Sequence, residues 1–262
     1  MCGLEGKIVL VTGSSSGIGA GAAMHFSAMK CRLSLVARSI DNLIMVAEAY
    51  RTAGAADVLV LSKDLSIAEE CVSAVEDTVT HFKGLDCVVN NAGILLKGDI
   101  FACTVQHFEM SMNVNAKSAF LITKAAIPHL ANSDVKSIVN VSSIAGLRAY
   151  PGSITYKISK SAMDQLTRCS ALDVAKLGIR INSVNPGVIE DTGMTMAGQT
   201  SGMSEEAVRE YMKHCVKTHP LGRPGRIEEV AKVITFLASQ NSSFVTGQTL
   251  AVDGGRSVMC PY

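Results

Sequence analysis

The sequence predicts a single α/β domain over residues 1–262: a doubly wound parallel sheet of seven strands with helices on both faces. Two observations predict it. Short apolar segments alternate with longer segments of helical periodicity along the whole chain, and no low-complexity linker or repeat interrupts them. Strands buried on both faces are continuous apolar runs, and parallel strands need crossover connections, which the intervening helices supply.

Seven short apolar segments are the expected strands. The first, KIVLV at residues 7–11, ends at a glycine-rich turn, as a buried parallel strand should. Six further segments have similar length and character: 32–36, 57–61, 87–89, 137–141, 179–184 and 248–252. The last of them closes at Asp253-Gly254-Gly255, residues typical of a turn.

Seven segments with helical character are the expected helices: 18–29, a helix after Ser39, 67–82, 106–130, 155–177, 204–216 and 226–239. The least regular part of the chain precedes the sixth of these and contains several glycines and methionines. We expect a substrate lid over residues 187–216, because glycines let a backbone turn and methionines make adaptable apolar contacts. A static loop whose methionines pack on the following helix is the alternative.

Charge and hydropathy exclude several classes of function. The 24 basic and 23 acidic residues nearly cancel, which gives no electrostatic footprint for nucleic acid or an anionic membrane. No apolar stretch approaches the roughly 18 residues of a membrane span, and the first residues do not resemble a signal peptide. We therefore expect a cytoplasmic protein. Its eight cysteines form no CxxC pair and are expected to be buried reduced thiols, with no metal site.

A glycine-rich turn, Thr12-Gly13-Ser14-Ser15-Ser16-Gly17-Ile18-Gly19, directly follows the first expected strand and opens a helix. Glycines there permit a tight turn and close approach of the backbone to a pyrophosphate, whose charge is favoured by the free amides of the helix N-terminus. A glycine-rich turn alone is weak evidence, but its place after the first strand favours a dinucleotide site. The residues expected to contact the dinucleotide here are Gly13, Ser15, Ser16, Gly17, Ile18 and Gly19.

The spacing TGxxxGxG resembles the short-chain dehydrogenase/reductase family, and further motifs follow in that family's order. They are Asn90-Asn91-Ala92-Gly93, Asn115 within VNAKSAF, Ser142-Ser143, Tyr156-Lys157-Ile158-Ser159-Lys160 and Asn185-Pro186-Gly187. The resemblance covers essentially the whole chain. It implies a Rossmann-type fold and nicotinamide-dependent oxidoreductase activity, with Asn91, Ala92, Gly93, Tyr156, Lys160, Pro186, Gly187 and Ile189 among the residues that contact the cofactor.

The candidate catalytic residues are Tyr156, Lys160, Ser143 and Asn115. Tyr156 and Lys160 are four residues apart on an expected helix and so share a face. A phenol of pKa about 10 needs its anion stabilised to exchange protons at neutral pH, which the Lys160 ammonium and the oxidised nicotinamide would do. The resemblance implies that Ser143 hydrogen-bonds the substrate oxygen, in preference to Ser142, and that Asn115 links Lys160 to solvent through a helix kink and a bound water. Taken singly, each residue has an ordinary structural interpretation.

The end of the second strand favours NADP(H) over NAD(H). An enzyme that prefers NAD places an acidic residue there, whereas this sequence has Ala37 followed by Arg38, whose guanidinium could pair with a 2′-phosphate. A solvated loop arginine is the alternative, and Ser16 occupies the family's second basic position. Further contacts implied by the resemblance are Ser39, Asp64, Leu65 and Thr192, the last arriving one residue later than the family's threonine.

The expected function is hydride transfer between NADP(H) and a ketone or secondary alcohol, with a small apolar carbonyl or steroid-like substrate. Residues expected to line the substrate site are Ile94, Leu95, Leu147, Tyr150, Met194 and Met196. A 3-oxoacyl carrier-protein reductase is an alternative, disfavoured because Leu172 stands where such enzymes commonly have arginine. A non-catalytic NADP(H)-binding regulatory protein is another, disfavoured because both Tyr156 and Lys160 are present. The resemblance and the long helices at 106–130 and 155–177 predict a homotetramer.

Overall fold

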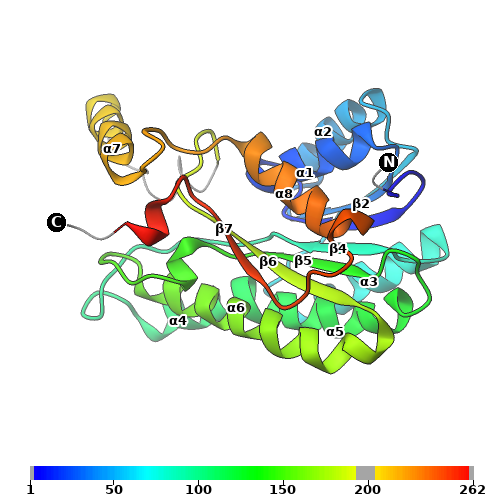
Figure 1. The fold of residues 1–262 in the computed structure, drawn as a ribbon. Helices are drawn as coiled ribbons and strands as arrows, with labels where there is room; N and C mark the ends of the chain where they lie inside the picture. Colours follow the sequence, from blue (N-terminus) through cyan, green and yellow to red (C-terminus); the bar gives the residue numbers. More distant parts are fainter. Residues whose placement is uncertain (1–2, 193–203, 260–262) are drawn as a thin grey trace.

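A seven-stranded parallel sheet forms the middle layer of the protein (Figure 1), with strand order β3-β2-β1-β4-β5-β6-β7. The computed structural model describes residues 3–192 and 204–259. The strands are β1 (Ile8–Thr12), β2 (Arg32–Ala37), β3 (Asp57–Ser62), β4 (Cys87–Asn90), β5 (Ser137–Val141), β6 (Arg180–Pro186) and β7 (Thr249–Val252). The chain direction and the strand order give one doubly wound domain, which confirms the predicted fold class.

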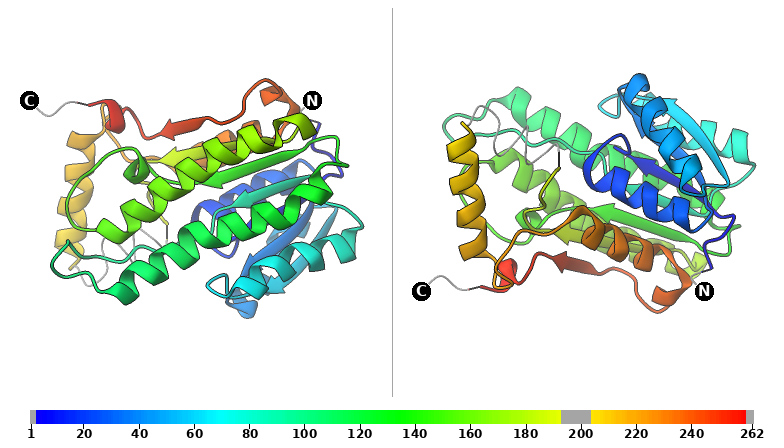
Figure 2. Two further views of the ribbon diagram at one scale, coloured as in Figure 1. Left: turned by 90° about the horizontal axis from the view of Figure 1, so that it is seen from below. Right: turned by 90° about the horizontal axis from the view of Figure 1, so that it is seen from above.

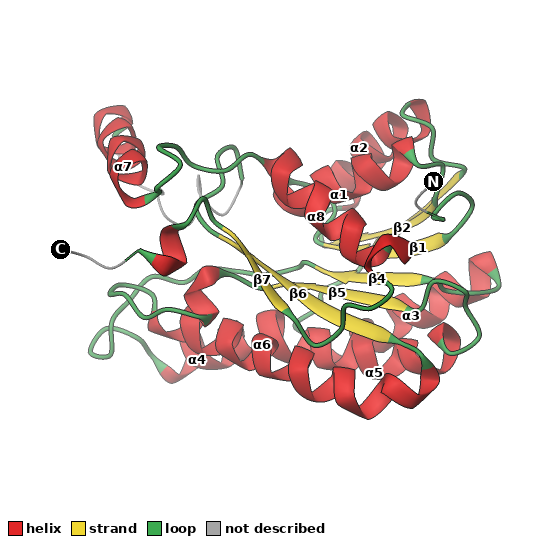
Figure 3. Ribbon diagram, viewed as in Figure 1, coloured by secondary structure: helices red, strands yellow, loops and turns green. Residues whose placement is uncertain are grey.

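Helices cover both faces of this sheet (Figures 2 and 3). The helices on one face are α1 (Gly17–Ala28), α2 (Ile40–Thr52) and α8 (Ile227–Ala238), and those on the other are α3 (Ala68–Phe82), α4 (Val105–Met112), α5 (Ser118–Leu130) and α6 (Ile154–Val174). Alternate side chains of β1 serve the two layers: Val9 and Val11 join one buried cluster, Ile8 and Leu10 the other. Helix α7 (Glu205–Thr218) stands apart, beyond the carboxyl ends of β6 and β7 (Figure 1).

The predicted helix at 106–130 is not one continuous α-helix, and its interruption agrees with the helix kink that the resemblance implied at Asn115. A π-helical turn at Asn113–Lys117 separates α4 from α5 and contains the fully buried Asn115. The side chain of Asn115 hydrogen-bonds the backbone of Ile94 on a neighbouring loop, so a wider turn here serves a tertiary contact. The other predicted elements match within two residues, except that 155–177 ends as a 3₁₀ turn at Ala175–Leu177.

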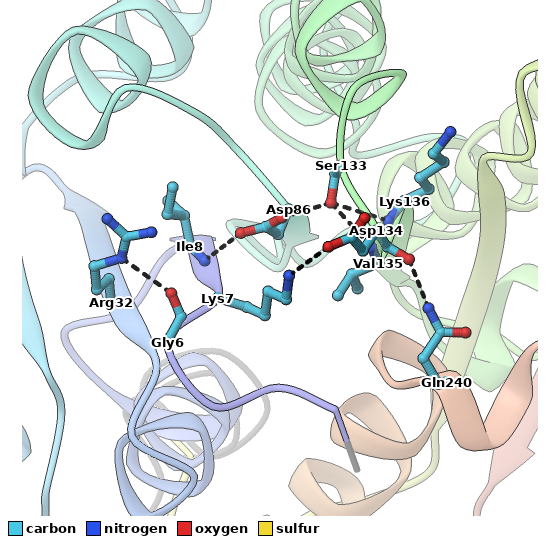
Figure 4. A network of polar contacts seen from close by, with 10 residues as sticks. All are labelled: Gly6, Lys7, Ile8, Arg32, Asp86, Ser133, Asp134, Val135, Lys136 and Gln240. Carbon is cyan, nitrogen blue, oxygen red and sulfur yellow. Dashed lines mark hydrogen bonds and ion pairs between the residues drawn. The ribbon is translucent and has the colours of Figure 1, made fainter.

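A polar network joins the loops at the amino-terminal ends of the strands (Figure 4). Asp86, just before β4, accepts hydrogen bonds from the backbone N–H of Ile8, at 2.8 Å, and from the Ser133 hydroxyl. Lys7 Nζ pairs with the Asp134 carboxylate at 3.1 Å. These contacts join β1, β4 and the loop before β5, so the amino-terminal ends of the strands have a structural role. The motifs that carry the candidate chemistry lie at the carboxyl ends of the strands.

The cysteines in the described part of the chain are unpaired. Four are buried as predicted, namely Cys31, Cys71, Cys87 and Cys215. The prediction is wrong for Cys169, which is exposed on α6, and Cys103 is half-buried. Periodicity does not distinguish the outer face of an amphipathic helix from its inner face when the residue is small.

No helix among residues 3–192 and 204–259 has the length and apolar character needed to cross a bilayer.

Candidate active site

A cavity of about 1080 Å³ opens at the carboxyl ends of the strands. Its wall is made by the loops that follow β1 to β6, by α6 and by α7. Nearly all the predicted site residues line it: Gly13, Ser15, Ser16, Gly17, Ile18, Arg38, Ser39, Asp64, Leu65, Asn91, Ala92, Gly93, Ser143, Tyr156, Lys160, Pro186, Gly187, Ile189 and Thr192. Two predicted residues, Gly19 and Asn115, stand behind the wall. This is the place where ligands of open α/β sheets bind.

The glycine loop is held tightly against the sheet. Gly13 and Gly17 have φ of +64° and +56°, a region that favours glycine. Asn91, after β4, donates from its side-chain amide to the carbonyls of Thr12 and Gly13, at 2.9 and 3.1 Å. Gly19 packs so closely that an added Cβ would lie 2.3 Å from the Gly13 carbonyl oxygen. Gly19 therefore packs against the loop and shapes it, and it is not among the described lining residues.

The first turn of α1 presents unpaired backbone donors to the cavity. Ser16, the N-cap residue, makes no side-chain capping hydrogen bond. Within the described residues the N–H groups of Gly17 and Ile18 have no acceptor. A helix N-terminus with free amides and a positive dipole end attracts an anion, so the loop fits a pyrophosphate.

Tyr156 and Lys160 lie one turn apart near the start of α6 and are both buried. Lys160 Nζ lies 5.8 Å from the centroid of the Tyr156 ring and donates to the carbonyl of Val141 at 2.8 Å. The hydroxyl of Ser143, from the loop after β5, lies close enough to the Tyr156 phenol to lower its pKa. Three side chains from two elements thus meet at one point of the cavity wall.

Burial moves the acidities of this pair in opposite directions. It raises the pKa of Tyr156 well above that of a free phenol, and the Ser143 hydroxyl partly opposes this. It lowers the pKa of Lys160 to about 8, with the Asp164 carboxylate opposing. The proton of Lys160 is consequently labile near neutral pH.

Asn115 is held rigidly behind Lys160. Its Oδ1 accepts from the Ile94 N–H at 2.7 Å, and its Nδ2 donates to the Ile94 carbonyl and to Ser159 Oγ, both at 2.9 Å. Gly93 borders the space between Asn115 and Lys160, since an added Cβ would lie 3.2 Å from Asn115 Oδ1 and 3.5 Å from Lys160 Nζ. No direct hydrogen bond joins the two side chains in the described structure.

Asp164 is a buried carboxylate that the sequence reasoning missed. It lies one turn after Lys160 and accepts from Asn185 Nδ2 at 3.0 Å and from Ser183 Oγ at 3.2 Å. Asn185 also donates to the backbone carbonyl of Ser143 at 2.9 Å. The asparagine of the Asn-Pro-Gly motif therefore fixes the turn that carries Ser143. The i,i+4 spacing of Lys160 and Asp164 was the available signal.

The opposite end of the cavity is basic at the end of β2. Arg38 is exposed there, and Ser39 caps α2 by accepting from the Asn42 N–H. Asp64 accepts two hydrogen bonds from Ser66. Lys63 also lines the cavity and pairs with Asp77 at 2.8 Å. Sequence reasoning missed Lys63, since it directly follows a strand end that resembled other solvated positions.

The predicted apolar lining is confirmed in part. Ile94, Leu95 and Tyr150 line the cavity, whereas Leu147 is not among the described lining residues and is partly exposed. Met194 and Met196 lie outside the described residues, as does the centre of the predicted lid. The two described flanks of that lid both adjoin the cavity: Thr192 lies against Gly17, and α7 contributes Tyr211 and His214.

A doubly wound sheet with a glycine loop after β1 and a buried tyrosine–lysine pair on α6 defines a class of nucleotide-dependent oxidoreductase. A family model described as enoyl-(acyl carrier protein) reductase matches residues 13–257, and the chain belongs to the short-chain dehydrogenase/reductase family.

Its relatives act on different substrates. The chain is 35% identical over 253 residues to a 3-oxoacyl-acyl-carrier-protein reductase of Thermotoga maritima, covering 96% of this chain and 98% of that one. It is 34% identical over 256 residues to a trans-4-hydroxycyclohexanecarboxylate dehydrogenase of Sinomonas cyclohexanicum, covering 96% and 93%. The crystal structure of levodione reductase superposes with a TM-score of 0.92 at 29% identity, covering 98% of this chain and 100% of that one.

Proposed function

We propose that the protein transfers hydride between NADP(H) and a ketone or secondary alcohol, and that its substrate is a small carbonyl or steroid-like compound. The observation that carries the proposal is the meeting of Tyr156, Lys160 and Ser143 in the wall of a cavity that also contains the glycine loop. A turnover screen of ketones and alcohols with both nicotinamide cofactors tests it. Absence of turnover with every pair, in protein that binds NADPH, would contradict it.

The described residues fit a nicotinamide dinucleotide. The free amides at the start of α1 would hold the pyrophosphate, and Asn91, Gly93 and Gly187 would border the nicotinamide half. When bound, the nicotinamide supplies or accepts the hydride. Everything else in the reaction falls to side chains of this chain.

The proton is assigned to Tyr156. In reduction its phenol donates to the developing alkoxide, and in oxidation its anion accepts the alcohol proton. Ser143, which lines the cavity beside the same phenol, orients the substrate oxygen toward it. The buried ammonium of Lys160 stabilises negative charge on the phenol oxygen, and Asn115 keeps the Ile94 loop and α6 in the register that places this lysine.

Ketone reduction should slow as the pH rises through about 8, the pKa to which burial lowers Lys160. The ammonium is fully present below that pH and is lost above it, while the buried phenol of Tyr156 keeps its proton over the same range. A pH–rate profile of kcat measures the descending limb. Lys160→Arg, whose guanidinium stays charged, should move that limb to higher pH; an unmoved limb in an active variant would assign it to another group.

NADPH should bind more tightly than NADH by about tenfold or more, since Arg38 can form a charge-assisted pair with the 2′-phosphate and Ala37 offers no carboxylate. Arg38→Gln should remove most of this difference by weakening NADPH alone. Fluorescence titration of both cofactors measures it. Arg51→Gln, an arginine on the outer side of α2, is the matched control. Equal affinity in the unchanged protein would overturn the NADP(H) assignment.

A carrier-protein reductase remains the second candidate because one relative has that activity. Such an enzyme commonly has an arginine on α6 with which to meet its acidic partner protein. Leu172 on α6 is 79% exposed and uncharged, which disfavours this candidate. A non-catalytic NADP(H)-binding role is disfavoured by the intact Tyr156–Lys160 pair.

We propose a homotetramer. Large apolar side chains are exposed along α4, α5 and α6, and again in the segments just before and just after β7. Two such surfaces on one chain suit a dimer of dimers. They include Val105, Phe108, Phe120 and Ile158 on the first surface and Phe244 and Val258 on the second. Light scattering should give four chain masses at micromolar concentration, and Phe244→Ser should reduce this to two; a single chain mass would refute the assembly.

A further inference from the structure

Both ends of the cavity have basic side chains, and the one described carboxylate lies at only one of them. β3 and β7 are the edges of the sheet, so the residues that follow them lie at opposite ends. Among the described lining residues the one acid, Asp64, follows β3. The end near β7 and α7 has Arg256 and His214, and Lys97 lines the wall from the loop after β4. Beyond Tyr156, then, the described wall contains basic groups and no carboxylate.

A turn fixes the backbone of Arg256, and its guanidinium has no hydrogen-bond partner in the described structure. Its backbone lies in a 3₁₀ turn (Arg256–Val258) that Asp253 fixes by accepting from the N–H groups of Gly255 and Ser257, at 3.0 and 2.6 Å. Its guanidinium carbon lies 5.9 Å from the centroid of the Tyr150 ring. In the described part of the chain that guanidinium makes no hydrogen bond or ion pair, and its one ring contact is with Tyr150. A half-buried guanidinium with all its donors free is poised for an anion.

The other cation beside Tyr150, Lys157, differs from Arg256 because its ammonium has hydrogen-bond partners. Lys157 Nζ lies 4.2 Å from the centroid of the same ring, yet it donates to Ser153 Oγ at 2.9 Å and to the Pro151 carbonyl. It is therefore occupied in fixing the loop before α6. Tyr150 and Tyr156 both line the cavity, so Arg256 lies beside a ring of the wall that also contains the proposed proton donor.

We propose that the substrate of this enzyme carries an anionic group, such as a carboxylate, which pairs with Arg256 while its carbonyl or hydroxyl carbon lies at Tyr156. The inference rests on the proposed oxidoreductase function and narrows its substrate class. A neutral substrate filling this end would strip water from the guanidinium and leave it unpaired, whereas a carboxylate would satisfy it with two parallel hydrogen bonds. Lys97 adds positive potential that attracts the anion to the cavity.

The test compares ligands that differ only in charge. Binding of cyclohexanecarboxylate and of cyclohexanecarboxamide to the NADPH complex is measured by calorimetry, and turnover of 4-oxocyclohexanecarboxylate is compared with that of its amide. The acid should bind and react about tenfold to a hundredfold better, the range for a charge-assisted hydrogen-bonded pair. Arg256→Gln should abolish this difference mainly through KM, Arg256→Lys should restore part of it, and Arg51→Gln, far from the cavity, should preserve it.

Each outcome decides a separate claim. Turnover of both ketones with no preference for the acid would overturn the anionic substrate and leave the proposed function standing. Binding of the acid that depends on Arg256, with no turnover of any ketone, would do the reverse. If Arg256→Gln fails to fold or to bind NADPH, the acid-to-amide ratio of the unchanged protein still decides, since a ratio near one overturns the inference.

Discussion

Replacement of Tyr156 by phenylalanine is expected to lower kcat by about a hundredfold to ten-thousandfold, the usual contribution of a positioned acid or base, with little change in cofactor affinity. The phenol is buried in the cavity wall beside Ser143 and one helical turn from Lys160. Phenylalanine keeps the ring and removes the proton. Steady-state kinetics and NADPH titration of the same preparation measure the two effects.

Tyr50→Phe is the matched control for this substitution. Tyr50 is as buried as Tyr156, and its hydroxyl donates to the Ser14 carbonyl at 3.0 Å, but it does not line the described cavity. Its loss should reduce stability by about 1 kcal/mol and spare turnover. If Tyr156→Phe retained most of its kcat while folded, another group would be the proton donor, and the proposal for this site would have to be replaced.

The sheet could be predicted because its strands are buried on both faces. Segments such as Ile8–Thr12 and Ser137–Val141 are wholly buried and give continuous apolar runs that turn residues terminate. Order along the chain then placed the motifs at one edge. The resemblance implied a helix kink at Asn115, but periodicity alone could not predict the π-helical turn at Asn113–Lys117, because long-range hydrogen bonds between Asn115 and Ile94 accompany it and no local preference marks it.

Parts of the site that depend on tertiary contact were likewise beyond the sequence. Asp164 resembles any polar residue on a helix until the fold buries it against Asn185. Arg256 follows the last strand in a turn that looks like a surface segment, and only the folding of β7 beside β6 brings it to the cavity. Motifs predicted the residues that we propose contact the cofactor, whereas Arg256, which we propose contacts the substrate, belongs to no motif.

The proposed contact of Arg256 with an anionic group is compatible with the apolar residues that line the same cavity. Ile94, Leu95 and Tyr150 can surround the carbon skeleton of a substrate, as the sequence suggested. Arg256 can then pair with an anionic group at one end of that skeleton. An apolar wall with a small number of placed polar groups is how small-molecule sites achieve orientation. A small apolar carbonyl compound and an anionic one are thus compatible descriptions of a single ligand.

Gly19→Ala is expected to weaken NADPH binding by tenfold or more and to lower stability by about 1 to 3 kcal/mol, the usual cost of overpacking. Its Cβ would lie 2.3 Å from both the Gly13 carbonyl oxygen and Asn91 Nδ2, and 2.9 Å from the Gly13 carbonyl carbon. Backbone atoms cannot rotate away as a side chain can. Either α1 must move off the loop or the Asn91 hydrogen bonds to Thr12 and Gly13 must break, and both displace the free amides at the helix start.

The sign of the stability change makes this prediction sharp. In an ordinary helix position, alanine in place of glycine stabilises by up to about 1 kcal/mol, so a destabilised Gly19→Ala protein would show that the contact with Gly13 outweighs helix propensity. Gly84→Ala is the matched control, because its Cβ would lie 3.4 Å from the flexible end of the Ile8 side chain, at the opposite edge of the sheet. Thermal unfolding and NADPH titration of both variants measure the difference. A Gly19→Ala protein as stable as the original, with unchanged NADPH affinity, would show that the loop is not packed as the structure describes.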